Sequence, residues 1–530
     1  MVALVGLFPG GEQTLRSAPF VVNTNLQMRL VMVTTNDTGA HSVRIAKDPR
    51  NDQLYYLKFN GDIYQVDLRP GDGASTSTRV YGSADHGITN SAQGMAVGPD
   101  GTIYVVGNFT TDGGNQTLAR IMKGVPDGSG GRKWSLLART EPYPLSLEFD
   151  HVFNGIVVSR DGHDIIVNSG SRTDHGEVQF TRGRFPNLRE VALTAKIFRL
   201  PAAGADLFLA NDDAALRGAG YIFAEGVRNP FDLAFAPNGD LFATENGPDR
   251  AMSEELNWLR AGQHYGFPWR MGGADNPQQF PDYDPDADLL LDPRFEGVRE
   301  GCYHNDPTFP PPPTNFAEPV INLGPDADSY QSPTDGSIQD ASSQGQTLST
   351  FTAHRSPLGL VFDTLGAMAP PFQYHGFMLS WSAGDPNGNN VVGPFKDASQ
   401  DMVDLDLTKL GETNYQARVT RIVGGFSNPI DAEIISNKVY VIEHGGRQGI
   451  WEIVFPPVQP SILLSAATLQ SDGSFRFDMG GAAGQLCEIW VSTNLMDWLF
   501  LTNLVLTNGQ FQFVDPAVAN RPYRFYHAVP

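Results

Sequence analysis

Apolar and polar positions along the chain recur in one pattern. A short strand of small apolar residues is followed by a turn with Asp or Asn and then by an aromatic or β-branched strand. Clear copies are VRIAKDPRNDQLYYLKFNGDIYQVDL at 43–68, QGMAVGPDGTIYVVGNF at 93–109, NGIVVSRDGHDIIVNSGS at 154–171, FDLAFAPNGDLFATENGP at 231–248 and IDAEIISNKVYVIEHGG at 430–446. A degenerate copy lies at 358–382, so the chain holds six units.

This repeat predicts the fold class. Several units continue into a third strand, as in AKIFRL and GIWEIVF. Short, evenly repeated strands favour small antiparallel sheets arranged around an axis over a parallel α/β fold. Six units therefore predict an all-β chain with a six-bladed β-propeller. The inner strands should be rich in small residues, as GMAVG and GIVVS are, because six strands crowd around one axis.

Two regions depart from the repeat. Residues 270–350 contain DYDPDADLLLDP and FPPPPTN, and we interpret them as a long insertion between the fourth and fifth units. After FPPVQPS the pattern changes to short strands with turns at SDGS and LTNGQ. The predicted domains are a propeller over 1–458 and a small β-sandwich of unknown role over 459–530.

Composition excludes some functions. The chain has 530 residues and a net charge of −22, which argues against a nucleic-acid partner because phosphate binding needs clustered Lys and Arg. No run of 18 apolar residues exists, so no membrane span is expected. The start, MVALVGLFPGGEQTL, lacks a basic leading region, so a signal peptide was either removed or never present. Cys302 and Cys487 are far apart in sequence and are expected to be unpaired.

Polar residues converge at one end of the predicted tunnel. In a propeller, the loop before each inner strand and the loop after each second strand share one face. Alignment of the units on their central turns gives a ring with one His, two Arg and several amides, with Ala40 or His41 from the first unit. The ring positions are Asn90, His151, Arg228, Arg355 and Ser427, with Asn229 matched by Asn428. Such side chains either bind a ligand or cap strand ends.

One long motif resembles a known family. GVRNPFDLAFAPNGDLFATENGPD, followed by EELNWLRAGQHYGFP, resembles the signature of the soluble quinoprotein aldose dehydrogenases, the glucose/sorbosone dehydrogenase family. FDHVFNGIVVSRDG resembles the His-containing start of an earlier blade in that family. The resemblance covers about residues 40–455 and implies a propeller that binds pyrroloquinoline quinone (PQQ) and calcium at its axis.

The resemblance also implies roles for individual residues. His151 would be the general base that removes the hydroxyl proton, and Asp150 would orient His151 or the substrate. Arg228 and Asn229 would contact the quinone carbonyl region. A His suits base catalysis near neutral pH, and an Arg stabilises the oxyanion charge of a quinone that is being reduced.

Calcium would be held by the turn that follows the motif's second strand. The family implies the backbone oxygens of Gly247 and Pro248 as ligands. Calcium prefers oxygen ligands, including backbone carbonyls, so such a turn does not need carboxylates. The segment DYDPDAD has Asp spacing similar to a calcium loop, but it lacks the turn Gly and the closing Glu, and Asp284 and Asp286 are the alternative ligands there.

The chain departs from the family at cationic positions. Where aldose dehydrogenases carry Arg-x-Arg before the last blade, this chain has Ser427 and Asn428, and FMLSWSAGD offers no match to the family's fifth-blade Lys. We expect Arg355 to supply part of the missing positive charge toward the cofactor, with Asn90 and Asn428 as further contacts. The alternative is that Arg355 pairs with an acidic loop residue.

The expected function is PQQ-dependent, calcium-requiring oxidation of a sugar or a related alcohol or aldehyde. One alternative is a calcium-dependent propeller lactonase that uses Glu245 and Glu443, and another is a ligand-binding propeller without chemistry. The substrate and the electron acceptor are not named by the sequence. Specificity is expected in the 270–350 insertion and around SRTDHGEV, and the location is expected to be periplasmic or extracellular.

Overall fold

The structure is a computed structural model that describes residues 18–34, 40–71, 73–146, 149–313, 315–382, 395, 397, 399–446, 448–458, 461–518 and 523–529. The expectation about the N-terminal segment falls outside these residues. Strands dominate, and the α-helices are α1 (Ser83–His86), α2 (Asp213–Gly218) and α3 (Glu296–Arg299). Within the described residues, no helix is long and apolar enough to cross a membrane.

Six of the sheets in the larger unit correspond to the six sequence repeats, and the main strands of each pair antiparallel. Blade 1 contains β3 (Ser42–Asp48), β4 (Gln53–Lys58), β5 (Ile63–Asp67) and β6 (Thr76–Tyr81). Blade 2 contains β7 (Ala92–Val97), β8 (Ile103–Thr111), β9 (Gln116–Pro126) and β10 (Arg132–Thr140), with β11 (Tyr143–Pro144) and β15 (Leu207–Leu209) added. Blade 3 contains β12 (Phe153–Val158), β13 (Asp164–Ser169), β14 (Lys196–Pro201) and β16 (Ile222–Glu225).

The remaining three blades complete the circle. Blade 4 contains β17 (Pro230–Phe235), β18 (Leu241–Glu245) and β19 (Glu255–Leu259). Blade 5 contains β25 (Pro357–Phe362), β26 (Gly376–Ser380), β27 (Asp401–Leu410) and β28 (Asn414–Gly424), with β1 (Phe20–Val21) and β22 (Ile321–Pro325) on β28. Blade 6 contains β29 (Pro429–Ile435), β30 (Lys438–Glu443), β31 (Gly449–Val454) and the N-terminal β2 (Gln27–Val33).

The inner strands form a closed ring. They contact one another in the order β3, β7, β12, β17, β25, β29 and back to β3. The ring is fastened where β2 from the N-terminus pairs antiparallel with β31 in blade 6. The predicted all-β, six-bladed propeller is therefore confirmed.

Close packing at the axis explains the small residues of the inner strands. A Cβ added to Gly94 would lie 2.0 Å from the Asn154 carbonyl oxygen, and one added to Gly155 would lie 2.7 Å from that of Phe231. Side chains at these positions would separate neighbouring blades, so only a hydrogen atom fits.

Every blade also has an irregularity near the start of its inner strand. The pairing between first and second strands shifts register between Ser42 and Arg44, Ala92 and Gly94, Phe153 and Ile156, Pro230 and Asp232, Pro357 and Leu360, and Pro429 and Asp431. Such bulges bend a strand and redirect side chains.

Charged side chains of the inner strands bond to neighbouring blades next to these bulges. Arg44 donates from Nε to the Gln93 carbonyl and from Nη2 to the Phe231 carbonyl, both at 2.7 Å, and its Nη1 lies 3.6 Å from Asp232. Asp431 accepts a 2.9 Å hydrogen bond from the Ile45 N–H. These contacts join blades 1, 2, 4 and 6 at the wall of a cavity of about 330 Å³ lined by all six inner strands.

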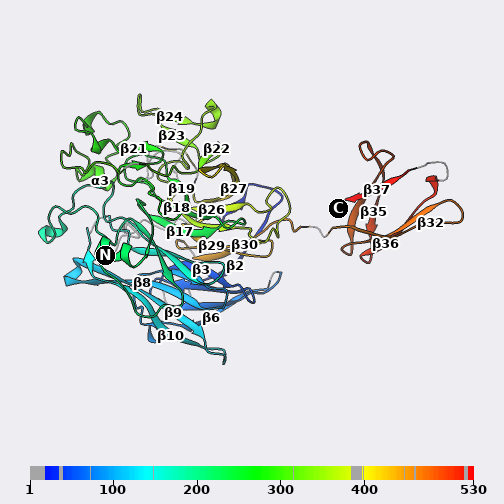
Figure 1. Ribbon diagram of the computed structural model, residues 1–530, viewed down its shortest axis with the longest axis horizontal. Coiled ribbons are helices and arrows are strands. Elements are labelled where there is room, and N and C mark those ends of the chain that lie inside the picture. Colours follow the sequence, from blue (N-terminus) through cyan, green and yellow to red (C-terminus); the bar gives the residue numbers. More distant parts are fainter. Residues whose placement is uncertain are drawn as a thin grey trace. The chain divides into compact units, whose positions relative to one another are not determined.

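The segment between blades 4 and 5 has little regular structure. It contains the short pairs β20 (Arg270–Met271) with β21 (Ala274–Asp275) and β23 (Ser329–Gln331) with β24 (Ile338–Asp340), besides α3 and β22. These elements are green in Figure 1. We refer to residues 270–350 as the insertion.

A second compact unit comprises residues 366–371 and 456–530. One sheet contains β32 (Leu463–Leu469), β33 (Phe475–Gly480) and β36 (Gln510–Asp515), and the other contains β34 (Gln485–Ser492), β35 (Trp498–Leu506) and β37 (Phe525–Val529). Phe477, Met479, Cys487, Ile489 and Leu506 form their shared core, so this unit is a β-sandwich. Cys302 and Cys487 form no disulfide bond within the described residues, as expected.

Candidate active site

The loops that lead into blades 3 and 4 meet at one rim of the propeller. The Ser171 N–H donates to the Arg228 carbonyl at 2.5 Å, and the His151 N–H donates to the Ser171 carbonyl at 2.8 Å. Gly170 allows this approach, since a Cβ there would lie 2.3 Å from the Cβ of His151. The structure therefore brings His151 and Arg228 together as the unit alignment predicts.

Arg228 is buried and tightly bound on one side. Its Nε donates to the Asp174 carbonyl at 2.6 Å, its Nη2 to Asp174 Oδ1 at 2.7 Å, and its Nη1 to the Asn246 carbonyl at 3.2 Å. A guanidinium carries five N–H groups, so one on Nη1 and one on Nη2 remain. These two have no acceptor within the part of the chain that the structure describes.

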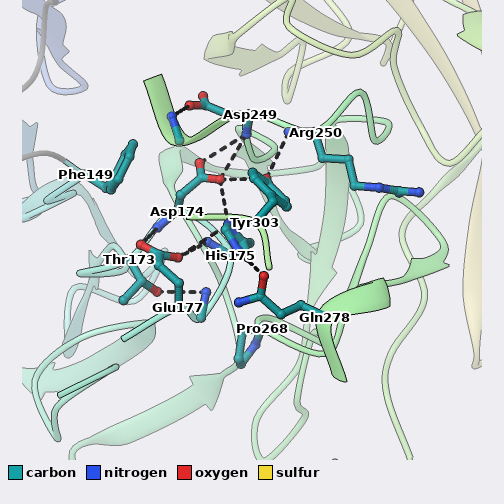
Figure 2. A network of polar contacts seen from close by, with 12 residues as sticks. Phe149, Thr173, Asp174, His175, Glu177, Asp249, Arg250, Pro268, Gln278 and Tyr303 are labelled. Carbon is teal, nitrogen blue, oxygen red and sulfur yellow. Dashed lines mark hydrogen bonds and ion pairs between the residues drawn. The ribbon is translucent and has the colours of Figure 1, made fainter. Parts of the chain in front are cut away.

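Asp174 is the centre of a buried polar network (Figure 2). Besides Arg228, it accepts hydrogen bonds from His175 Nδ1 at 2.9 Å, from the Tyr303 hydroxyl at 2.7 Å and from the Asp249 N–H at 3.1 Å. Burial alone would raise the pKa of Asp174, but the Arg228 cation and the bonds from His175 and Tyr303 hold that pKa below its usual value.

His151 lies beside this network with a half-buried side chain. Burial, and then the neighbouring Arg228 cation, lower the pKa of His151 to about 3. Its Nδ1 is 3.4 Å from the Ser171 hydroxyl. The imidazole is therefore neutral at physiological pH, which is the form that can accept a proton.

Asp150 is buried, and its Oδ1 accepts a 2.8 Å hydrogen bond from the Ser146 N–H. This bond fixes Asp150 relative to Ser146. The expected role of Asp150 in orienting His151 or the substrate stays a prediction.

The turn predicted to ligate calcium follows β18. Glu254 fixes it by accepting hydrogen bonds from the Gly247 N–H and from the Ser356 N–H, the latter at 2.6 Å. Burial raises the pKa of Glu254 to about 8, and burial with the nearby Asp174 charge raises the pKa of Asp249 to about 7. Pro248 is buried. Calcium ligation by the backbone oxygens of Gly247 and Pro248 stays a prediction.

The side chains of the described residues offer no clear alternative site for calcium. Among the described residues, no group of three or more His, Cys, Asp or Glu side chains could hold a metal ion. Asp284 Oδ1 instead accepts a hydrogen bond from the Asp286 N–H at 3.1 Å, and Asp288 pairs with Arg250 at 2.7 Å. The acidic segment of the insertion thus stabilises its own turns.

Arg355 pairs with side chains of its own blade. Its guanidinium does pair with acidic residues, namely Asp397 and, at 2.6 Å, Asp401, and it also contacts the Ser380 hydroxyl at 3.0 Å. This pairing is the alternative named in the sequence analysis, and a contact between Arg355 and a cofactor carboxylate stays a prediction. Asp397 and Asp401 of the same blade thus already balance the charge of Arg355.

The amides of the ring have separate environments. Asn90 is exposed, and Asn229 accepts from Asn154 Nδ2 at 3.4 Å. Asn428 donates from Nδ2 to the Trp381 carbonyl at 3.1 Å. In blade 6, His444 stacks on His41 with ring centroids 4.3 Å apart, which places His41 on the same rim. Cofactor contacts by Asn90, Asn229 and Asn428 stay predictions.

The sequence analysis missed the partners of Arg228. Asp174, His175 and Glu177 lie in the SRTDHGEV loop, where only the density of ionisable residues after a buried strand gives a signal. Tyr303 lies more than a hundred residues further along, in the insertion. No local pattern connects it with Asp174, because their contact depends on how the insertion folds over blades 3 and 4.

The rim of this propeller therefore places a neutral His beside a buried Arg that has two N–H groups without an acceptor among the described residues. The sequence profile of the family "Glucose / Sorbosone dehydrogenase" matches residues 61–289, which include His151, Arg228 and Gly247. The resemblance to the soluble quinoprotein aldose (glucose/sorbosone) dehydrogenase family is thereby confirmed.

Individual relatives are more distant. The chain is 35% identical over 82 residues to "Quinoprotein glucose dehydrogenase B" from Acinetobacter calcoaceticus, which covers 15% of this chain and 16% of that protein. Among solved structures, a glucose dehydrogenase is 15% identical with a TM-score of 0.49 over 82% of this chain and all of its own. The PQQ-bound aldose sugar dehydrogenase of Streptomyces coelicolor is 15% identical with a TM-score of 0.44, over 82% of this chain and 99% of its own.

Proposed function

We propose that the protein is a quinoprotein dehydrogenase that uses PQQ and calcium to oxidise a sugar or a related alcohol or aldehyde. The observation that carries this proposal is the position of Arg228 and His151 on one rim, where Ser171 connects their backbones. Both residues lie inside the segment that matches the family. Arg228 is 5% exposed and keeps two N–H groups without an acceptor in the described chain. Buried donors are normally satisfied, so these two point to a ligand that supplies oxygen atoms.

The residues at this rim fit PQQ and calcium in part. Arg228 would donate to a quinone oxygen, Asn229 would lie beside it, and Gly247 and Pro248 would offer backbone oxygens to calcium. The three carboxylates of PQQ find fewer cations than in the family, because Ser427 and Asn428 stand in place of Arg-x-Arg and Arg355 is already paired. We therefore expect weaker cofactor binding than a full set of arginines would give.

The chain's own residues account for proton and charge handling. PQQ, when bound, supplies the acceptor for the hydride that leaves the substrate carbon. His151 is neutral and takes the hydroxyl proton on Nε2, since its Nδ1 faces the Ser171 hydroxyl. Arg228 stabilises negative charge on the oxygen to which it donates. Asp150 and the Ser171 hydroxyl keep the loop around His151 in place.

The lactonase alternative is less well supported. Glu245 accepts hydrogen bonds from the Arg228 N–H and from Asn257 Nδ2, and Glu443 accepts from the Ser427 N–H at 2.7 Å. Both carboxylates therefore fix the loops that lead into their blades instead of converging on an ion. A ligand-binding propeller without chemistry is left as the outcome of the test below.

The test uses the purified chain with PQQ and calcium chloride and a panel of aldoses and polyols. Bleaching of an artificial electron acceptor that requires sugar, PQQ and calcium together supports the proposal. Release of acid from lactones without an acceptor would establish a lactonase. Saturable binding of a sugar with neither reaction would establish a binding module. A periplasmic or extracellular location and the natural electron acceptor stay separate predictions.

A further inference from the structure

We propose that Asp174 is a positioning residue for Arg228, and that the insertion holds Asp174 in place through Tyr303. This inference rests on the proposed function, because it assigns the part of the chain that presents Arg228 to the cofactor. It gives the insertion a role in the site itself, in addition to any role in choosing the substrate.

The hydrogen bonds of Asp174 leave it little freedom. Its backbone oxygen accepts from Arg228 Nε at 2.6 Å, and Oδ1 accepts from Arg228 Nη2 at 2.7 Å. Oδ2 accepts from His175 Nδ1 at 2.9 Å and from the Tyr303 hydroxyl at 2.7 Å. A carboxylate has about four lone-pair positions, so this one is nearly saturated. The Nε and Nη2 donors of Arg228 are thereby fixed on Asp174. This orientation of the guanidinium sets the direction of its two N–H groups that have no acceptor among the described residues.

His175 provides the second support. Its Nδ1 lies 2.9 Å from Asp174 Oδ2 and 3.4 Å from Glu177 Oε2, and its Nε2 is 3.2 Å from Gln278 Oε1. Its ring stacks on Tyr303 with centroids 3.7 Å apart. Donors of Arg228 and His175 therefore face the carboxylates of Asp174 and Glu177, which offsets part of the cost of burying these groups.

The insertion closes over the network from outside the blades (Figure 2). Tyr303 donates to Asp174, Gln278 accepts from His175, and the Gly297 N–H donates to Asp249 Oδ2 at 2.7 Å. In Figure 2, Tyr303 and Gln278 both point toward His175. These three contacts come from residues 278–303 and reach the loops of blades 3 and 4 that carry Arg228's partners. The insertion thus holds Asp174, His175 and Asp249 in place next to Arg228.

An experiment can distinguish a network that only stabilises the fold from one that positions Arg228. If Asp174 only stabilises the fold, its loss lowers stability and leaves cofactor affinity unchanged in the protein that remains folded. If it positions Arg228, its loss weakens cofactor binding and slows turnover more than it changes the KM for the sugar.

The experiment compares Tyr303→Phe, Asp174→Asn and a control, Asp404→Asn, with the wild type. Tyr303→Phe keeps the ring that stacks on His175 and removes only the hydroxyl. Asp404 is also a buried carboxylate paired with a His, with 3.0 Å to His375 Nδ1, but it lies on β27 outside the network. PQQ affinity is measured by titration with calcium present, thermal stability by melting, and kcat and KM with one aldose.

We expect PQQ to bind roughly 10-fold more weakly to Tyr303→Phe and about 10–100-fold more weakly to Asp174→Asn, as for loss of one or more charge-assisted bonds. Asp404→Asn should lower the melting temperature without changing PQQ affinity. Wild-type affinity in both Tyr303→Phe and Asp174→Asn would overturn the inference and leave the proposed function intact. Absence of PQQ binding by the wild type would overturn the proposed function, and this inference with it.

Discussion

The ion pairs of Arg355 give the sharpest test of how the rim is built. Arg355 is 2% exposed and binds both Asp397 and Asp401, while Arg421 also reaches Asp401 at 3.2 Å. Replacing Arg355 with Met leaves one buried carboxylate without its cation and the other with a weaker partner. Breaking a buried pair by removing one member costs about 3–5 kcal/mol of the free energy of unfolding. Because Arg421 keeps part of the compensation, we expect about 3 kcal/mol.

The free energy of unfolding that Arg355→Met loses should be larger at high pH than at low pH. Burial by itself would raise the pKa of Asp397, but Arg355 reverses this and holds that pKa below its usual value. Without Arg355, burial raises the pKa of Asp397 in the folded state above its value in the unfolded state. The folded variant then binds more protons, so its free energy of unfolding increases as pH falls and decreases as pH rises through that raised pKa. The difference from the wild type should be larger at pH 8 than at pH 5.

Urea unfolding followed by tryptophan fluorescence at both pH values measures this effect. The double variant Arg355→Met with Asp401→Asn should recover part of the loss, and Arg139→Met, which breaks an exposed pair with Asp206, should cost less than about 1 kcal/mol. The reasoning is refuted if Arg355→Met leaves the urea midpoint unchanged while PQQ affinity falls by about one to two orders of magnitude. Arg355 would then serve the cofactor, as the sequence analysis expected.

Four further outcomes follow from the site. His151→Ala should lower turnover by about 10²–10⁴ with PQQ affinity nearly unchanged, and full activity would remove His151 from the mechanism. Because the pKa of His151 is lowered to about 3, its protonation should not limit kcat/KM between pH 5 and 8, and a limb near pH 6.5 that disappears in His151→Ala would contradict that assignment. Calcium chelation should abolish PQQ binding and lower the melting temperature of the loaded protein by mass action, and unaltered PQQ titration in chelator would exclude the predicted calcium site. Gly170→Ala should destabilise the propeller, since its Cβ would lie 2.3 Å from that of His151; an unchanged melting temperature would show that the loops relax freely.

The sequence by itself determined the blades. Hydrophobic alternation, turn residues and the count of units depend on neighbours within a single hairpin, so they can be read locally. The same local logic explains why small residues mark the inner strands, where Gly94 and Gly155 face the backbone of the next blade. Placing His151 and Arg228 on one rim also needed only the unit alignment, because a propeller repeats its geometry from blade to blade.

Glu245 and Glu443 show an intermediate case. Their equivalent positions in two units are visible in the sequence, yet their chemistry is not. In the structure each accepts a hydrogen bond from the N–H of the residue that opens its own blade, Arg228 or Ser427. The repeat therefore indicates a shared role, and the hydrogen bonds show that this role is to fix the leading loops.

Only the tertiary structure decided which charges pair. Arg228 and Arg355 occupy equivalent positions before their inner strands. Arg228 binds Asp174 of the neighbouring blade and has two N–H groups without an acceptor among the described residues, whereas Arg355 pairs with Asp397 and Asp401. Tyr303 reaches Asp174 from the insertion across more than a hundred residues of sequence. A buried charge is stabilised by whichever opposite charge the fold brings within about 3 Å, and that distance is set by packing between blades and insertion, not by spacing along the chain.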